Sequence, residues 1–220
     1  MIKSDHLSYI VAAYLSGRGY YSEISPEVPD ATHVPDVVAI KPRMNEVKLR
    51  FEKGGAPVGI IYLLLENEWL TTEEILRETH FERAFAIGVL DEAKENGWVR
   101  KKVGPSGSAS WALDLYKIPA TECLMVMSAA EKPSDALEAL EELSGSFDKG
   151  YLAFPYPIDD GFLHKCSHHK TGVMVFDKKT ASILIQLAAK RQKITKLKAH
   201  ASVCESAVIN HSIRTTGQPY

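Results

Sequence analysis

The sequence contains few cysteines, no long apolar run and no overall excess of positive charge. Its three cysteines, Cys123, Cys166 and Cys204, are odd in number and far apart, which argues against a disulfide scaffold and favours a reducing compartment. No apolar stretch approaches the roughly 20 residues of a membrane-spanning helix, and the N-terminus lacks the apolar segment of a signal peptide. We therefore expect a soluble, cytoplasmic protein with no membrane partner.

The net charge of −2 over 220 residues does not mark the chain as a whole as a nucleic-acid-binding protein. The charges are unevenly distributed, however. Residues 59–117 carry seven Lys/Arg and ten Asp/Glu, whereas residues 178–220 carry eight Lys/Arg and a single acidic residue. The sequence therefore predicts a basic surface near the C-terminus rather than in the middle of the chain.

The middle of the chain has the most definite local pattern. Residues 58–67 form a short apolar run that suits a buried helix. Thr71 and Glu74 have the spacing of a capping box, which predicts a second helix to about residue 79. A third helix and two strands are expected next, over residues 81–96, 98–103 and 110–117. Three helices followed by a hairpin resemble a winged helix-turn-helix module.

The segments on either side of this module are predicted to form one sheet together. Helices are expected over residues 5–15, 134–143 and 180–198. Strands are expected over residues 20–28, 34–40, 45–52, 122–127, 150–154, 162–168 and 172–176. The prediction is an α/β (α+β) fold in which residues 1–57 and 118–200 form a discontinuous mixed-sheet domain. Residues 58–117 then form a winged helix-turn-helix domain, and residues 201–220 a C-terminal tail.

The most important motif in the flanks is the β-branched run within residues 33–40, which contains Pro35 and has Asp36 as its first charged residue. It is accompanied by the opening helix and by residues 19–20, 122–130, 137–143, 151–155 and 172–177. Together these segments resemble the restriction-endonuclease-like (PD-(D/E)xK) family, over most of residues 1–57 and 118–190. The resemblance implies a nuclease-like sheet, interrupted here by the winged module.

The same resemblance implies a Mg²⁺ site. Asp36 would match the first acid of the family, and Glu46 and Lys48 its acid-x-Lys pair. Asp36 and Glu46 would hold the ion while Lys48 orients the attacking hydroxide. In the family, however, the acid-x-Lys strand leads directly into a helix, and residues 122–127, which do so here, lack the motif. Three interpretations stay open. The Mg²⁺ site is active and lies before the insert, or Glu46 and Lys48 only mimic the motif and the site is degenerate. In the third, Glu122 or residues 131–132 supply a ligand from a displaced position.

Each of these residues also has a structural explanation. Asp36 would cap a loop or pair with Lys41. Charges that alternate at Glu46, Lys48 and Arg50 are typical of a solvated strand face.

A second group of metal-binding residue types lies in the strand expected over residues 162–168. His164, Cys166 and His168 would share one face of that strand. They would either bind zinc or form a solvated strand face with a buried thiol. The sequence favours the second, because no other Cys or His lies near enough in sequence to be a fourth ligand.

Candidate DNA-contacting residues occur in two places. In the winged module they lie at the start of the third helix and on the wing: Arg77, His80, Arg83, Arg100, Lys101 and Lys102. The last expected helix adds a basic cluster: Lys190, Arg191, Lys193, Lys196 and Lys198. Glu82 would oppose phosphate, and the acidic balance of the module makes protein docking a nearly equal alternative. The basic cluster would otherwise complement the dipole at a helix C-terminus.

The sequence therefore favours a protein that binds double-stranded DNA on a nuclease-like scaffold, with a regulatory role and a degenerate active site. One alternative is a Mg²⁺-dependent DNA endonuclease that uses Asp36, Glu46 and Lys48. Another is a protein-docking adaptor that acts through the winged module. A homodimer would double the basic surface.

Overall fold

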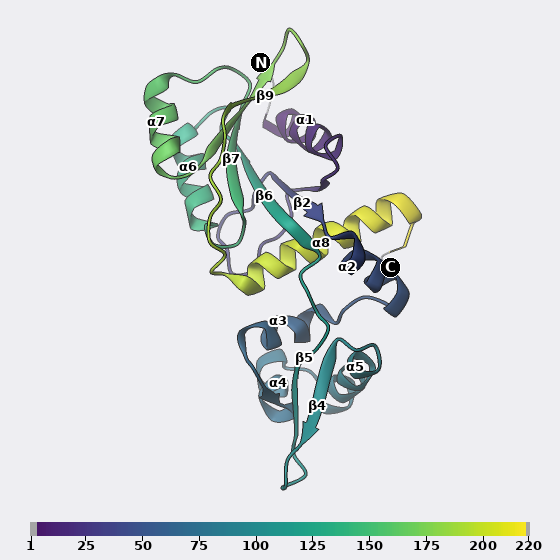
Figure 1. The fold of residues 1–220 in the computed structure, drawn as a ribbon. Helices are drawn as coiled ribbons and strands as arrows, with labels where there is room; N and C mark the ends of the chain where they lie inside the picture. Colours follow the sequence, from purple (N-terminus) through teal and green to yellow (C-terminus); the bar gives the residue numbers. More distant parts are fainter. Residues whose placement is uncertain (1–3, 219–220) are drawn as a thin grey trace.

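Two separate β-sheets organise the chain (Figure 1). The computed structural model describes residues 4–218. The larger sheet has the strand order β1-β2-β6-β7-β8-β9: β1 (Tyr21–Ile24), β2 (Val37–Pro42), β6 (Ala120–Ser128), β7 (Lys149–Phe154), β8 (Gly172–Asp177) and β9 (Ser182–Leu187). The β6–β7 and β7–β8 pairs are parallel and the other three pairs antiparallel. We call this sheet, with the helices packed on it, the sheet unit.

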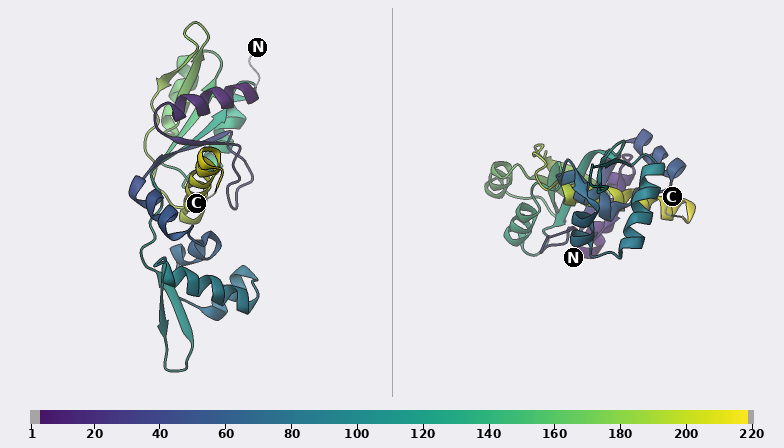
Figure 2. Two further views of the ribbon diagram at one scale, coloured as in Figure 1. Left: turned by 90° about the vertical axis from the view of Figure 1, so that its right-hand side faces the viewer. Right: turned by 90° about the horizontal axis from the view of Figure 1, so that it is seen from below.

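Helices cover both faces of the larger sheet, because successive side chains of a strand point to opposite faces. α1 (Ser4–Ser16) packs through Leu7 and Val11 on one face. Three helices bury residues in the core of the other face: α6 (Pro133–Glu142), α7 (Asp160–His168) and α8 (Leu197–Thr216). Figure 2 shows that the molecule is elongated, with β8 and β9 at one end and the hairpin of residues 99–113 at the other.

The segments before and after the middle of the chain do lie in one sheet. β2 pairs with β6 along its length, with Val37 opposite Val126 and Ile40 opposite Cys123. The predicted mixed α/β architecture is therefore confirmed. The restriction-endonuclease-like assignment stays a prediction, since strand order by itself does not identify a family.

The second sheet belongs to residues 58–117, which we call the small unit. It contains α3 (Val58–Glu66), β3 (Leu70–Thr71), α4 (Thr72–Thr79), α5 (Arg83–Glu95), β4 (Val99–Val103) and β5 (Ala109–Leu113), with the strand order β3-β5-β4. Trp98 and Trp111 are at most 1% exposed and lie in its core with Ile61, Ile75 and Leu90. The predicted order of three helices and a hairpin is confirmed.

Residues 45–52 form a helix rather than the predicted strand. α2 (Met44–Lys53) buries Val47 and Arg50, which are three residues apart as on one face of a helix. The segment alternates polar and apolar residues, but five of its eight residues are strong helix formers, and that preference prevails. Glu46 and Lys48 do not share a face, since residues two apart on a helix point about 200° apart.

Residues 162–168 also form a helix, α7, rather than a strand. The carboxylate of Asp159 accepts a hydrogen bond from the Phe162 backbone N–H at 3.1 Å, which caps the first turn. An N-cap aspartate stabilises a helix by satisfying an amide that has no partner within the helix.

The helix predicted over residues 180–198 is wrong as well. Its first part forms β9, whose β-branched Ile183 and Ile185 pair with β8. Residues 188–196 then run without regular structure to α8, which extends through most of the predicted C-terminal tail. Of the chain that the structure describes, no helix is long and apolar enough to cross a membrane.

A buried ion pair outside the small unit anchors that unit through hydrogen bonds to its last residues. Arg50 of α2 and Glu205 of α8, 0% and 2% exposed, form a salt bridge. Arg50 also donates to the Lys117 carbonyl at 3.0 Å, and the Tyr116 hydroxyl donates to Glu205 at 2.8 Å. Burial raises the pKa of Tyr116, and the Glu205 carboxylate raises it further. Because α3 also packs against α8, the start and the end of the small unit are both held against the sheet unit.

Candidate nucleic-acid interface

Local sequence signals fix the helical part of the small unit. Thr71 caps α4 by accepting from the Glu74 N–H at 3.2 Å, while the Glu74 carboxylate accepts from the Thr71 N–H at 2.7 Å. α4 ends at His80, which has left-handed backbone with φ of 57°. α5 begins three residues later, after Glu82 in the N-cap position. The result is two helices joined by a tight turn, as in a helix-turn-helix.

The residues predicted to face a major groove lie around this turn, but acids offset most of their charge. Arg77, in the last turn of α4, pairs with the adjacent Glu78 at 3.3 Å. Arg83, the first residue of α5, forms an exposed salt bridge with Glu73 of α4. His80 lies in the turn and not in the third helix as predicted. This end of α5 therefore offers little free positive charge.

The exposed side of α5 near its start is instead apolar. Phe85 is 56% exposed and Phe81 39% exposed, and their rings meet edge to face at 5.1 Å between centroids. Ala84 and Gly88, on the same helix, are also exposed. Exposed aromatic side chains in a cluster are typical of contact surfaces.

The hairpin carries the clearest basic surface of the small unit. The guanidinium of Arg100 lies 5.1 Å and the ammonium of Lys102 4.6 Å from the centroid of the Trp69 ring. Lys101 points to the other face of β4, where it pairs with Asp91 at 3.1 Å and lies over Trp111. We call Trp69, Arg100 and Lys102 the wing face. Strand alternation explains why only two of the three predicted cations belong to it.

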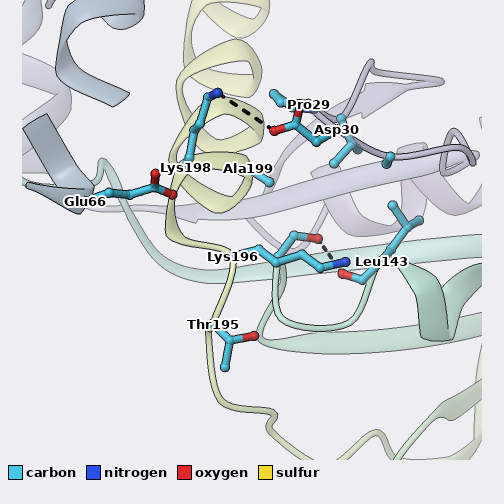
Figure 3. Close-up of a pocket in the computed structure, with 11 residues that line it drawn as sticks. Pro29, Asp30, Glu66, Leu143, Thr195, Lys196, Lys198 and Ala199 are labelled. Atoms are coloured by element: carbon cyan, nitrogen blue, oxygen red, sulfur yellow. Dashed lines mark hydrogen bonds and ion pairs between the residues drawn. The ribbon is translucent and has the colours of Figure 1, made fainter. Parts of the chain in front are cut away.

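The predicted basic cluster of the C-terminal region is dispersed. Its five members lie in the segment 188–196 or in the first turn of α8, not at the end of a helix: Lys190, Arg191, Lys193, Lys196 and Lys198. Arg191 pairs with the buried Asp148 at 2.7 Å. Lys196 donates to the Glu142 carbonyl. Lys198 Nζ lies 3.8 Å from Asp30 Oδ2, and both residues line a cavity of about 360 Å³ (Figure 3). Three of the five therefore hold parts of the sheet unit together.

The residues predicted to bind Mg²⁺ are not brought together. Asp36 precedes β2, and its carboxylate accepts from the Ser128 N–H at 2.5 Å. Glu46 and Lys48 lie on α2, beyond the other end of β2. Six strand residues at about 3.3 Å each separate the ends by roughly 20 Å. Asp36 and Glu46 therefore cannot hold one ion.

The second predicted group, on α7, does not form a ligand set. Cys166 is buried, whereas His164 and His168 are exposed, since the helix turns residues two apart to different sides. The neighbouring His169 pairs with Glu141 of the sheet unit. Burial raises the pKa of the Cys166 thiol to about 11.

A group that the sequence did not reveal is Cys123 of β6 with His200 and Cys204 of α8, all buried. A hydrogen bond with Cys204 lowers the pKa of the Cys123 thiol, and burial raises the pKa of Cys204. The spacing of four between His200 and Cys204 would have indicated one helix face. The sequence does not reveal the group because the predicted tail begins at residue 201, which separates Cys204 from His200, and because Cys123 is distant in sequence.

Comparisons with known proteins do not assign this chain to a family. No family model matches the chain, and no curated protein matches it. Among solved structures, the chain is similar to one described as "Mechanism for regulation of DNA binding of Bordetella bronchiseptica BpsR by 6-hydroxynicotinic acid". The identity is 14% and the TM-score 0.25, over 33% of this chain and 61% of that one, which is less than two thirds of its length. A likeness of this degree carries no argument for fold or function.

Proposed function

We propose that this protein binds double-stranded DNA through the hairpin of its small unit and acts as a regulatory protein. The observation that carries the proposal is the wing face, where Arg100 and Lys102 flank the indole of Trp69 at the base of an exposed hairpin. Both cations are exposed although they lie over the ring, and arginine and lysine side chains of this kind bind phosphate oxygens.

The helix-turn-helix arrangement supports the same role. α5 follows a tight turn after α4, and the hairpin follows α5, which is the order in which winged modules place a helix and a wing on a duplex. α5 begins with an arginine that is already paired to Glu73. Binding would therefore depend more on backbone contacts from the wing than on base contacts from α5, and sequence discrimination would be modest.

A hydrolytic role has no comparable support. The two carboxylates that would share a Mg²⁺ ion lie at opposite ends of β2, and Lys48 lies with Glu46 on a helix. In the sheet unit, the paired acids and cations instead join strands and loops, as in the pairs Lys149–Glu122 and Arg191–Asp148. The sheet unit would serve as the scaffold on which the DNA-binding unit is mounted.

The exposed pair Phe81 and Phe85 favours a second candidate function, protein docking through α5. The occupant that we infer is a second copy of the chain, since winged modules commonly act as dimers and two copies would double the wing face. DNA binding and self-association would then use adjacent surfaces of one unit. Docking without DNA binding is the alternative that the following experiment separates.

A salt titration of affinity for a short DNA duplex tests the proposal. Each phosphate contact contributes about −0.9 to the slope of log affinity against log salt concentration. The double variant Arg100→Ala/Lys102→Ala should bind more weakly and lose about two contacts, so that the slope becomes shallower by about two. The matched control, Lys190→Ala/Lys193→Ala, removes two exposed cations from the sheet unit and should leave the slope unchanged.

Two results would overturn the proposal. A flat slope for the unmodified protein would mean that it makes no phosphate contacts, which leaves the docking role alone. An equal loss in both double variants would mean that binding follows overall charge and not the wing face.

A further inference from the structure

We propose that Cys123, His200 and Cys204 form a binding site for a zinc ion or a similar thiophilic metal, buried between β6 and α8. The sulfur atoms of the two cysteines and one ring nitrogen of His200 all lie within 4.8 Å of one another. Two thiolates and one imidazole are the donors of a Cys₂His zinc site, which keeps its fourth position for a non-protein ligand.

The spacing of the three donors is close to that of a bound site. With metal–sulfur bonds of about 2.3 Å and metal–nitrogen bonds of about 2.1 Å, neighbouring ligand atoms in a tetrahedral site lie roughly 3.6 Å apart. Cys204 Sγ lies 4.0 Å from His200 Nε2. The donor atoms, at most 4.8 Å apart, would have to approach one another by only about 1 Å to reach coordination distance.

The surroundings of His200 select the nitrogen that would bind. Its Nδ1 lies 2.9 Å from the Ser146 carbonyl, to which it donates, so that Nε2 presents its lone pair to the two sulfur atoms. A metal-binding histidine usually has its other nitrogen held by a carbonyl or carboxylate in this way. The His200 ring is therefore already in the tautomer and orientation that coordination requires.

The position of Cys123 is fixed from the opposite side. The Asp148 carboxylate accepts from the Cys123 backbone N–H at 2.8 Å, and Arg191 donates to the same carboxylate at 2.9 Å. These two hydrogen bonds hold the Asp148 carboxylate against β6, and it is not one of the three donors. The three donors come from two rigid elements, a central strand and one face of a helix, since His200 and Cys204 are four residues apart.

Open space adjoins the donor set on the side of His200. A cavity of about 390 Å³ is lined by His200 and Asp148, together with Thr121 and Arg191. Cys123 and Cys204 are 0% exposed, so the imidazole is the part of the donor set that reaches this cavity. A water molecule or a small anion entering from the cavity would supply the fourth ligand, with the nearby cations Arg43, Lys117 and Arg191 favouring an anion.

Cobalt provides the direct test, because Co²⁺ occupies zinc sites and reports thiolate ligands by charge-transfer absorption in the near ultraviolet. The full chain, reduced with a phosphine, is titrated with Co²⁺ and then with Zn²⁺. We expect absorption that saturates at one Co²⁺ per chain, with the intense visible bands of a four-coordinate ion, and its loss when Zn²⁺ is added. Zn²⁺ should also raise the melting temperature.

The matched control is Cys166→Ala, which removes the third buried cysteine and lies outside the cluster. It should behave as the unmodified protein, whereas Cys123→Ala and Cys204→Ala should each lose the charge-transfer bands and the thermal shift. Far-UV circular dichroism establishes that each variant is folded, and either of the two suffices. The absence of saturable thiolate absorption in the unmodified protein, or its survival in both cluster variants, would overturn the proposal. Neither readout involves DNA, so the result is independent of the proposed function.

Discussion

The two units of this molecule differ in the surroundings of their most prominent charged residues. In the sheet unit, acids and bases turn inward or pair across loops, as Asp148 does with Arg191 and as Glu205 does with Arg50 at the junction. In the small unit, Arg100 and Lys102 stand on the surface over Trp69, and the core contains apolar and aromatic side chains. The net charge of a segment therefore does not show whether its cations are available to contact a partner. Three of the five clustered cations in the more basic segment hold structure together, while the acidic small unit displays Arg100 and Lys102 outward.

This contrast assigns different roles to the two units. A unit whose polar groups satisfy one another is suited to hold a scaffold or a buried ligand, whereas outward cations on an aromatic base are suited to contact a partner. The roles meet at α8, which contributes His200 and Cys204 on one part of its surface and Glu205 to the junction with the small unit. Substitutions at the junction, in the core of the small unit and in its capping box test these roles.

The largest effect is expected from Glu205→Ala at the junction. The substitution leaves the Arg50 guanidinium buried without its carboxylate partner, and removing one partner of a buried pair costs about 3–5 kcal/mol of unfolding free energy. Urea denaturation measures the loss. The matched control is Arg83→Ala, which breaks the exposed pair with Glu73 and should cost less than about 1 kcal/mol.

A double substitution of the Arg50–Glu205 pair separates the effect of the buried charges from the effect of side-chain packing. The double variant Arg50→Met/Glu205→Leu removes both charges and keeps apolar volume, so it should recover most of the stability lost by Glu205→Ala. A double variant as unstable as the single one would mean that the hydrogen bonds to the Lys117 carbonyl and Tyr116 matter more than the charge pair.

The next largest effect tests whether the two units unfold together. Leu90 is fully buried in the small unit, and Leu90→Ala should cost about 2–5 kcal/mol. All three tryptophans, Trp69, Trp98 and Trp111, lie in the small unit, so fluorescence follows that unit alone while circular dichroism follows the whole chain. Because the junction is buried, we expect both signals to shift together to lower urea. A fluorescence transition that moves ahead of the dichroism would show two independent units.

The small unit was the part best predicted from sequence, because its signals are local. The capping box of Thr71 and Glu74 and the left-handed Gly97, with φ of 75°, act within a few residues and fix where helices begin and end. β2 and β6 could be predicted as strands because continuous apolar runs suit a strand buried on both faces.

The errors fall where a pattern has two explanations that only tertiary contacts decide. Residues 45–52 alternate like a strand, but Arg50 is buried only because Glu205, 155 residues away, receives it. Residues 182–187 have apolar spacing compatible with a helix, but pairing with β8 makes them a strand. The Cys123, His200 and Cys204 group depends on the same long-range docking of α8 on β6, which no local pattern encodes.

The smallest effect is expected from Glu74→Gln, which removes the charge from the capping box and keeps its shape. The Thr71 backbone N–H donates to the Glu74 carboxylate and lowers the pKa of Glu74 in the folded protein. A lowered folded pKa means that the carboxylate stabilises the fold above its unfolded pKa, and that this contribution disappears as pH falls through the folded value. The urea midpoint by tryptophan fluorescence should therefore differ between the two proteins at neutral pH and converge in acid.

The matched control for this measurement is Glu95→Gln, an exposed residue in the last turn of α5, where a negative charge opposes the helix dipole. Removing that charge should leave the midpoint unchanged or raise it slightly at neutral pH, the opposite sign to Glu74→Gln. If both substitutions lowered the midpoint equally, the cause would be the charge of the small unit as a whole. The capping box would then contribute through its shape alone, and the acidic balance of the unit would itself be stabilising.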